Sequence, residues 1–211
     1  LAPRARRDLW RWVFNDQPRQ LFTSGAERDA AKQIKTAIAT GEFGATKGGS
    51  VSLVGAGPGA KDLITLRGVQ RLQEADVIFY DRLLDPEILD LARRDAERIY
   101  VGKAPGCHSW PQDKITQTLV FAAQRGQRVV RLKCGDPGVF ARSTEEIDAF
   151  KANGIAFEIV PGVTAACAAA ATLGESLTER GAVDSLVLTT GHLEQGYAVP
   201  DAIKDLKPGT C

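Results

Sequence analysis

The chain has 211 residues, a hydrophobic fraction of 44% and a formal net charge of +1 at pH 7. This is enough apolar material for a sizeable core, and the small net charge argues against a nucleic-acid binder that relies on bulk positive charge. The four cysteines are scattered without a CxxC pair, a pattern typical of reduced thiols rather than of a zinc site or a disulfide framework. No apolar run is long enough to cross a bilayer. We therefore expect a cytoplasmic protein without a metal, a membrane or a nucleic-acid partner.

The first 49 residues differ in pattern from the rest of the chain. An arginine-rich stretch around Trp10 and Trp12 fits a short amphipathic helix, and residues 26–39 fit a second helix rich in Ala, Lys and Glu. A turn-forming stretch, 46–50, is typical of a linker. Such a segment cannot form a core alone, so we expect residues 1–49 to be a helical dimerisation and linker segment, followed by the main domain over 50–211.

From Val51 onward, short apolar runs alternate with helical patterns. The predicted strands are 51–54, 76–80, 97–101, 128–132, 156–160 and 185–190. The predicted helices are 65–75, 86–94, 112–125, 143–153 and 165–173. Short buried strands that alternate with helices predict an α/β fold, an open and mostly parallel sheet with helices on both faces.

The helix ends carry the usual signals. Thr65 and Ser143 are candidate N-caps, and Ser143 together with Glu146 forms a capping-box pattern. Gly126 and Gly154 fit the position just after a helix end, where a left-handed residue is common.

Three glycine and proline loops each follow one of the predicted strands, at 55–59, 133–137 and 161–165. In an open α/β sheet, ligands bind outside the carboxyl ends of the strands. Glycine there lets the backbone come close to a ligand, and proline stiffens the loop. The three loops therefore predict one shared ligand crevice.

The first loop also fits a different class of ligand. Gly55, Gly57 and Ala60 match the dinucleotide fingerprint, and Asp81 follows about twenty residues later. In a dinucleotide-binding fold, however, the helix begins inside the glycine motif and its N-terminus holds the pyrophosphate. Here the best N-cap is Thr65, so the helix is predicted to start too late. A dinucleotide-binding oxidoreductase lobe remains an alternative.

Several stretches occur in the order seen in uroporphyrinogen-III C-methyltransferases, namely 51–59, 76–83, 101–103, 111–112, 129–133, 135–137, 160–165 and 190–193. The chain from residue 50 to about 210 thus resembles the methyltransferase part of a siroheme synthase, in the tetrapyrrole methylase family. Residues 1–30 resemble, more weakly, the helical tail of the dimerisation region of such enzymes. The resemblance implies two α/β lobes with S-adenosylmethionine between them, of which this chain holds the first.

The resemblance also implies an activity and a set of residues. The activity is the C-methylation of uroporphyrinogen III at C2 and C7 to precorrin-2, with S-adenosylhomocysteine as the second product, in siroheme or corrinoid synthesis by a homodimer. Asp81 would be the proton acceptor, Lys103 the proton donor and Arg131 a substrate-binding residue. The cofactor-binding residues that it implies are Pro58, Cys134, Gly135, Asp136, Val139, Thr164 and Ala165. Arg131 is also notable without the resemblance, because an arginine inside a buried strand needs a partner.

Some positions depart from the usual pattern of the family. Ala104 follows Lys103 where an arginine is common, and Cys134 stands where glycine is common. Changes at Gly138 and Ser143 alter the shape of the predicted pocket. They leave open the methylation of a later precorrin. A non-catalytic chain whose helical arm serves only for dimerisation is a separate alternative.

Overall fold

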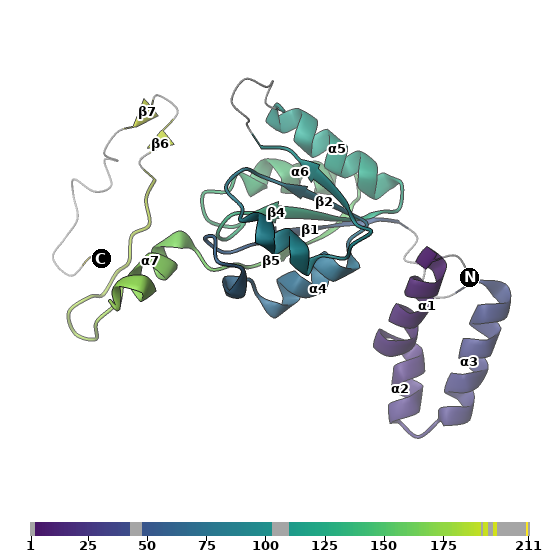
Figure 1. The fold of residues 1–211 in the computed structure, drawn as a ribbon. Helices are drawn as coiled ribbons and strands as arrows, with labels where there is room; N and C mark the ends of the chain where they lie inside the picture. The colour runs from purple at the N-terminus through teal and green to yellow at the C-terminus, as the bar shows by residue number, and fades with distance from the viewer. Residues whose placement is uncertain are drawn as a thin grey trace. The chain divides into compact units, whose positions relative to one another are not determined.

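The computed structural model describes residues 3–42, 48–102, 110–190, 192–193, 196–197 and 210. It divides the chain into two compact units, Leu1–Gly48 and Gly49–Cys211 (Figure 1). Within the described residues, no helix is both long enough and apolar enough to span a bilayer.

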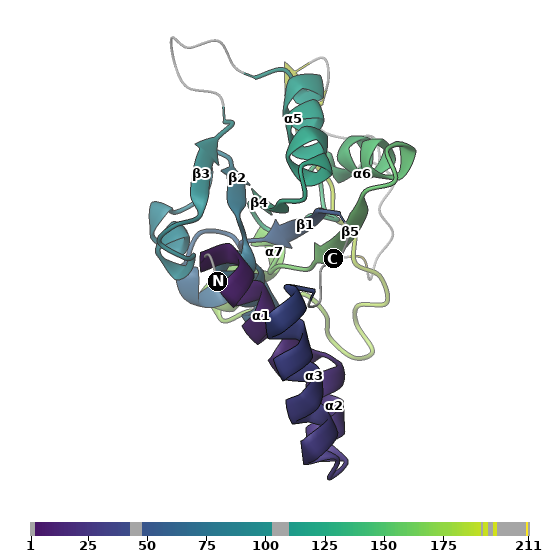
Figure 2. The same ribbon diagram turned by 90° about the vertical axis from the view of Figure 1, so that its right-hand side faces the viewer.

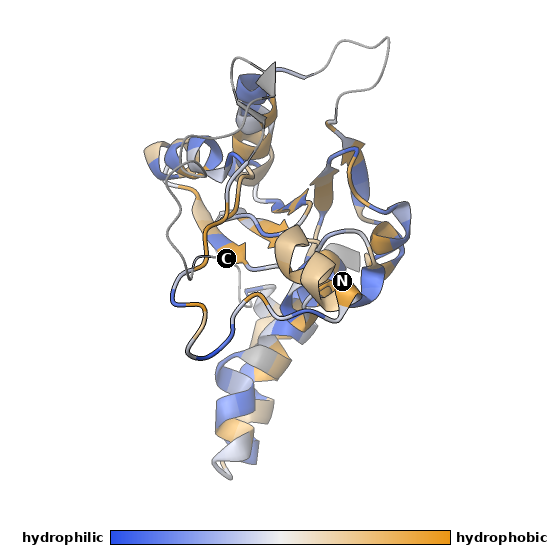
Figure 3. Ribbon diagram, turned by 90° about the vertical axis from the view of Figure 1, so that its left-hand side faces the viewer, coloured by the Kyte–Doolittle hydropathy of each residue, from blue (hydrophilic) through white to orange (hydrophobic). Residues whose placement is uncertain are grey.

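The N-terminal unit consists of the helices α1 (Pro3–Asn15), α2 (Gln17–Thr23) and α3 (Glu27–Thr40). The helix α2 was not predicted from the sequence. Its Pro18 lies in the first turn, where a proline removes no intrahelical hydrogen bond. Leu9 and Ala37 are buried against each other, and polar and apolar residues alternate along these helices (Figure 3).

The second unit is built on five parallel strands, which confirms the predicted α/β class. They are β1 (Ser50–Gly55), β2 (Val77–Tyr80), β3 (Glu97–Tyr100), β4 (Arg128–Lys133) and β5 (Ala156–Val160). Their order in the sheet is β3-β2-β4-β1-β5, with β4 and β1 at the centre (Figure 2).

Helices cover both faces of this sheet, as predicted. On one face α4 (Leu66–Glu74) and the 3-10 helix η2 (Pro86–Leu91) pack on alternate strand residues such as Val130 and Leu132. On the other face lie α5 (Gln112–Gln124) and α6 (Ser143–Ala152), packed on Val129 and its neighbours. Because side chains alternate along a strand, Arg131 and Lys133 point to the face covered by α5 and α6. The remaining elements are the 3-10 helix η1 (Lys61–Leu63), α7 (Ala165–Leu173), β6 (His192–Leu193) and β7 (Gly196–Tyr197).

Most of the predicted helix ends are confirmed, and one is wrong. The Thr65 hydroxyl accepts a hydrogen bond from Gly68 N, and Gly126 and Gly154 have φ angles of 79° and 64°. Ser143, however, is not an N-cap: it is the first residue of α6, and Arg142 precedes it with a φ of 52°. The Ser143 hydroxyl donates instead to the carbonyl of Pro137, at 2.6 Å, so the capping box does not form.

The predicted strand at 185–190 is also wrong. Ser185 forms only an isolated bridge to Thr210 in the described part of the chain, and residues 186–190 are in no strand. Leu186, Val187 and Leu188 are 42%, 38% and 40% exposed. An apolar, β-branched run favours a strand only where a neighbouring strand pairs with its backbone and covers its side chains.

A half-buried ion pair joins the edge strand β5 to α4. Glu158 accepts hydrogen bonds from Arg71 and, at 2.8 Å, from the Ser52 hydroxyl. Burial alone would raise the pKa of Glu158, but the hydrogen bonds from Arg71 and Ser52 outweigh it and lower the pKa below its ordinary 4.5. The stabilisation is therefore present at a pH above the ordinary pKa and is lost as the pH falls through the lowered one.

We therefore expect Glu158→Gln to destabilise the protein by about 1 kcal/mol at neutral pH, with the difference shrinking below about pH 4. Urea unfolding at pH 7 and pH 3 measures it. Glu97→Gln, on the exposed face of the other edge strand, is the control and should have little effect at either pH. A destabilisation by Glu158→Gln that is equally large at pH 3 would contradict this assignment.

Candidate active site

The three predicted loops meet at the carboxyl ends of β1, β4 and β5. Gly57 and Gly135 form an antiparallel bridge, with hydrogen bonds of 3.3 Å from Gly57 N and 2.8 Å from Gly135 N. Gly162 packs so closely on this bridge that a Cβ there would overlap the carbonyl oxygen of Gly135 and the Cα of Gly55. We call these four glycines the glycine junction. It brings the three loops together, as the sequence predicted.

The Asp136 carboxylate joins the second loop to the third through hydrogen bonds. Its Oδ1 accepts from Gly138 N at 2.6 Å, and its Oδ2 accepts from Gly162 N at 2.9 Å. Each oxygen keeps a lone pair, so the carboxylate can still bind a cation of a ligand. That role stays a prediction.

The junction leaves part of its backbone accessible to a ligand. Gly135 has a φ of 68°, and a Cβ added there would point into open space, so a ligand can approach the backbone closely. Thr164 is the N-cap residue of α7, but its side chain makes no cap hydrogen bond. Pro58 is half-buried in the first loop, and Ala165 is exposed at the start of α7.

A pocket of about 570 Å³ opens beside the junction, a size typical of small-molecule sites. Asp81, Arg131, Cys134 and Val139 all line it, so the structure brings these four predicted residues together. Lys103 lies outside the described residues. The other predicted cofactor residues belong to the loops and are not among the residues that line this pocket.

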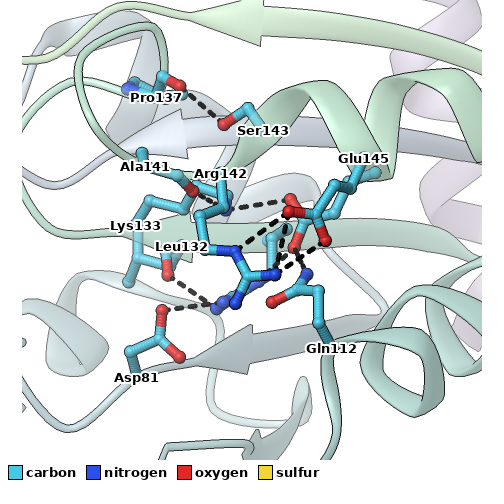
Figure 4. Close-up of polar contacts among 11 residues, drawn as sticks. Asp81, Gln112, Leu132, Lys133, Pro137, Ala141, Arg142, Ser143 and Glu145 are labelled. Carbon is cyan, nitrogen blue, oxygen red and sulfur yellow. Dashed lines mark hydrogen bonds and ion pairs between the residues drawn. The ribbon is translucent and has the colours of Figure 1, made fainter. Parts of the chain in front are cut away.

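The ion pair between Asp81 and Arg131 is the most prominent feature of the pocket (Figure 4). Asp81 follows β2 directly, and its Oδ2 lies 2.7 Å from Arg131 Nη2. The Arg131 side chain is only 3% exposed, whereas that of Asp81 is 32% exposed. The guanidinium is thus fixed in the interior, and the carboxylate is the partner that a ligand can reach.

Glu146 of α6 extends the Asp81–Arg131 ion pair into a buried network of polar side chains. Its Oε1 accepts from Arg131 Nε at 3.2 Å and from the Gln112 amide at 3.1 Å. Its Oε2 lies 3.0 Å from Lys133 Nζ, an ion pair outside hydrogen-bond geometry. Lys133 also donates to the carbonyl of Ala141 at 2.6 Å. Burial lowers the pKa of Lys133, and the charge of Glu146 opposes that shift.

Cys134, which follows Lys133, is half-buried and carries a free thiol. Burial raises the pKa of that thiol, which favours the neutral form at pH 7. Among the described residues, no group of three or more His, Cys, Asp and Glu side chains is placed to hold a metal.

Three members of the network were missed by the sequence analysis. Lys133 had a usable signal, because it lies two residues after Arg131 on a buried strand and so shares its face. Glu146 was assigned to a capping box, and Gln112 lay in one of the stretches that resemble the family but was given no role. Their positions depend on how α5 and α6 pack on the sheet.

Comparison with known proteins identifies the family to which this fold belongs. The family model of the tetrapyrrole (corrin/porphyrin) methylases matches residues 50–206. A siroheme synthase from Chromobacterium violaceum is 48% identical over 192 residues, which cover 91% of this chain and 40% of that protein. The chain therefore spans about two fifths of the length of this curated relative.

Solved structures show the same fold. A uroporphyrin-III C-methyltransferase from Thermus thermophilus has a TM-score of 0.63 and 41% identity, over 74% of this chain and 65% of that one. A structure of such an enzyme from the same organism, complexed with S-adenosyl homocysteine, has a TM-score of 0.57 and 41% identity, over 72% of this chain and 59% of that one. Because the family model matches residues 50–206, which is most of this chain, the chain belongs to the tetrapyrrole methylases.

Proposed function

We propose that this chain binds S-adenosylmethionine at the glycine junction and takes part in the C-methylation of uroporphyrinogen III at C2 and C7 to precorrin-2. The observation that carries the proposal is the Asp81–Arg131 pair, which lines a pocket next to the junction. The related enzyme complexed with S-adenosyl homocysteine supports the choice of cofactor. The siroheme synthase and the uroporphyrin-III C-methyltransferase among its relatives support the choice of substrate.

The residues of the junction suit the cofactor. When bound, S-adenosylmethionine supplies an electrophilic methyl group on a sulfonium sulfur. Backbone groups at Gly57, Gly135 and Gly162 would contact it without bulky side chains between, and Asp136 would accept from its ammonium group. Thr164 and Ala165 lie where the third loop enters α7, and they would border the same site.

The residues of the pocket suit the substrate and the proton that methylation releases. The substrate has eight carboxylates, and the guanidinium of Arg142, which is exposed at the pocket and paired with Glu145, would exchange this partner for one of them. After a ring carbon has taken up the methyl group, the macrocycle loses a proton. Asp81 Oδ1 is free of the Arg131 contact and would accept that proton, while Arg131 holds the carboxylate in place through Oδ2.

Calorimetric titration with S-adenosylhomocysteine, with NAD in parallel, tests the cofactor assignment. We expect heat of binding from S-adenosylhomocysteine alone. Binding of NAD alone would overturn the proposal in favour of a dinucleotide site, and binding of neither would mean that the junction does not hold the cofactor by itself. The structure already argues against a dinucleotide site, because α4 begins at Leu66 and its N-terminus is not part of the glycine motif.

The identity of the substrate is tested by the methylation reaction itself. Incubation with uroporphyrinogen III, and separately with a later precorrin, followed by product mass, distinguishes the two substrate classes. The assay uses the 211-residue chain or, where the chain is encoded within a longer polypeptide, that polypeptide.

We also propose that the protein is a cytoplasmic homodimer joined through residues 1–49. The large apolar side chains exposed on this unit, Trp10, Phe14, Phe22 and Ile38, support a partner there. Light scattering with and without the segment tests the dimer: the same number of chains per particle in both cases would reject it.

A further inference from the structure

Glu146 is completely buried, yet it does not line the pocket. It meets the pocket through Gln112 and through two cations that also line it, Arg131 and Lys133. These two side chains come from β4, and Glu146 comes from α6, so the carboxylate joins the sheet to the helix behind the proposed proton acceptor, Asp81.

The contacts of Glu146 fix the direction of the guanidinium. Arg131 Nε donates to Glu146 Oε1, Nη1 donates to the carbonyl of Leu132 at 3.2 Å, and Nη2 donates to Asp81 at 2.7 Å. With Nε and Nη1 held in the interior, the planar guanidinium presents Nη2 toward Asp81. The Gln112 amide donates to the same Oε1 and limits the rotation of the carboxylate.

Stability alone does not explain such a network. A buried carboxylate between two buried cations has a large desolvation cost, and apolar side chains of similar volume are often as stable. What the charges provide is a single arrangement of these side chains, in which each hydrogen bond has a fixed direction. The geometry is therefore better suited to holding a reactive group in place than to strengthening the core.

We propose that Glu146 is a positioning residue of the methyltransferase site, which orients Arg131 and through it the carboxylate of Asp81. It also holds Lys133, whose ammonium group binds the carbonyl of Ala141 and so fixes the loop that forms one wall of the pocket. The inference rests on the proposed function in taking Asp81 as the proton acceptor. The orientation of Arg131 can be measured without any substrate.

The first test is hydrogen exchange of the Arg131 Nε–H group, followed by NMR and assigned by its absence in Arg131→Lys. Glu146→Gln keeps the shape of the side chain but removes the charge of the acceptor. We expect it to speed this exchange by about tenfold or more, because a hydrogen bond to a charged group is lost. Asp148→Asn removes a charge from the exposed side of the same helix and should leave the exchange within about twofold.

The second test is a double-mutant cycle on turnover. In the positioning role, Glu146→Gln lowers kcat by about 10- to 100-fold, with the affinity for S-adenosylhomocysteine unchanged, because Asp81 is displaced from its productive geometry. In an Asp81→Asn background, the same substitution should have little further effect. A purely structural role would lower turnover by the same factor in both backgrounds, and this outcome, or unchanged Nε–H exchange, overturns the proposal.

A third variant covers the case in which Glu146→Gln does not fold. Glu146→Asp keeps the charge on a shorter side chain, so it withdraws the acceptor from Arg131, and the same two measurements then apply. A wild-type protein that binds S-adenosylhomocysteine but does not methylate uroporphyrinogen III would reject the proposed function. In that case the exchange measurement alone decides whether Glu146 orients Arg131.

Discussion

Replacing Asp81 by asparagine is expected to lower the rate of methyl transfer to uroporphyrinogen III by about 10²- to 10⁴-fold. Asparagine keeps the size of the side chain and an acceptor oxygen for Arg131 Nη2, but it cannot take up a proton. Asp81 is 32% exposed, whereas Glu146 of the same network is fully buried, so no other acid of the network can replace it. The release of S-adenosylhomocysteine measures the rate.

The control for this variant is Asp90→Asn, which removes an exposed carboxylate from η2. It should leave the rate and the thermal midpoint nearly unchanged. The affinity of Asp81→Asn for S-adenosylhomocysteine should stay within about twofold of wild type, because the junction is formed by other loops. Full turnover in Asp81→Asn would remove Asp81 from the proton transfer.

Replacing Gly162 by alanine is expected to weaken the binding of S-adenosylhomocysteine by at least about tenfold and to destabilise the protein by about 1–3 kcal/mol. The new Cβ would overlap the carbonyl oxygen of Gly135 and the Cα of Gly55, which are backbone atoms and cannot rotate away. The third loop must then move outward, and the hydrogen bond from Gly162 N to Asp136 Oδ2 is lost. Calorimetry and urea unfolding measure the two effects.

Gly138→Ala is the matched control in the same region. A Cβ at Gly138 would meet only the Asp136 carboxylate, at 3.0 Å, and this side-chain group can shift slightly. We therefore expect a small effect on stability and on affinity. Wild-type affinity in Gly162→Ala would show that the junction is not where the cofactor binds.

The sequence by itself determined the five strands of the sheet and the edge of the sheet at which the three loops lie. The strands β1 to β5 are short apolar runs ended by glycine, proline or polar residues, and these signals are local. The start of α4 was equally local, because the Thr65 hydroxyl accepts a hydrogen bond from the backbone N–H of Gly68, only three residues away. Since the strands of a parallel sheet all end at one edge, the loops that follow them lie at that edge. That the three loops touch one another also requires β4, β1 and β5 to be neighbours in the sheet.

Only the tertiary structure decided which residues pair with Arg131. It also decided that the predicted capping box and the predicted strand at 185–190 do not form. Arg131 was expected to need a partner, but whether Asp81, Glu146 or both would supply it depends on the order of the strands and on the packing of α6. Ser143 and Glu146 fit a capping box, yet the buried Glu146 carboxylate forms ion pairs with Arg131 and Lys133 instead. Such charge-assisted contacts are stronger than the hydrogen bond of a helix cap. The run at 185–190 has the composition of a strand but no neighbouring strand among the described residues. Local patterns report what a segment can form, whereas buried charges and strand pairing depend on partners that are distant in the sequence.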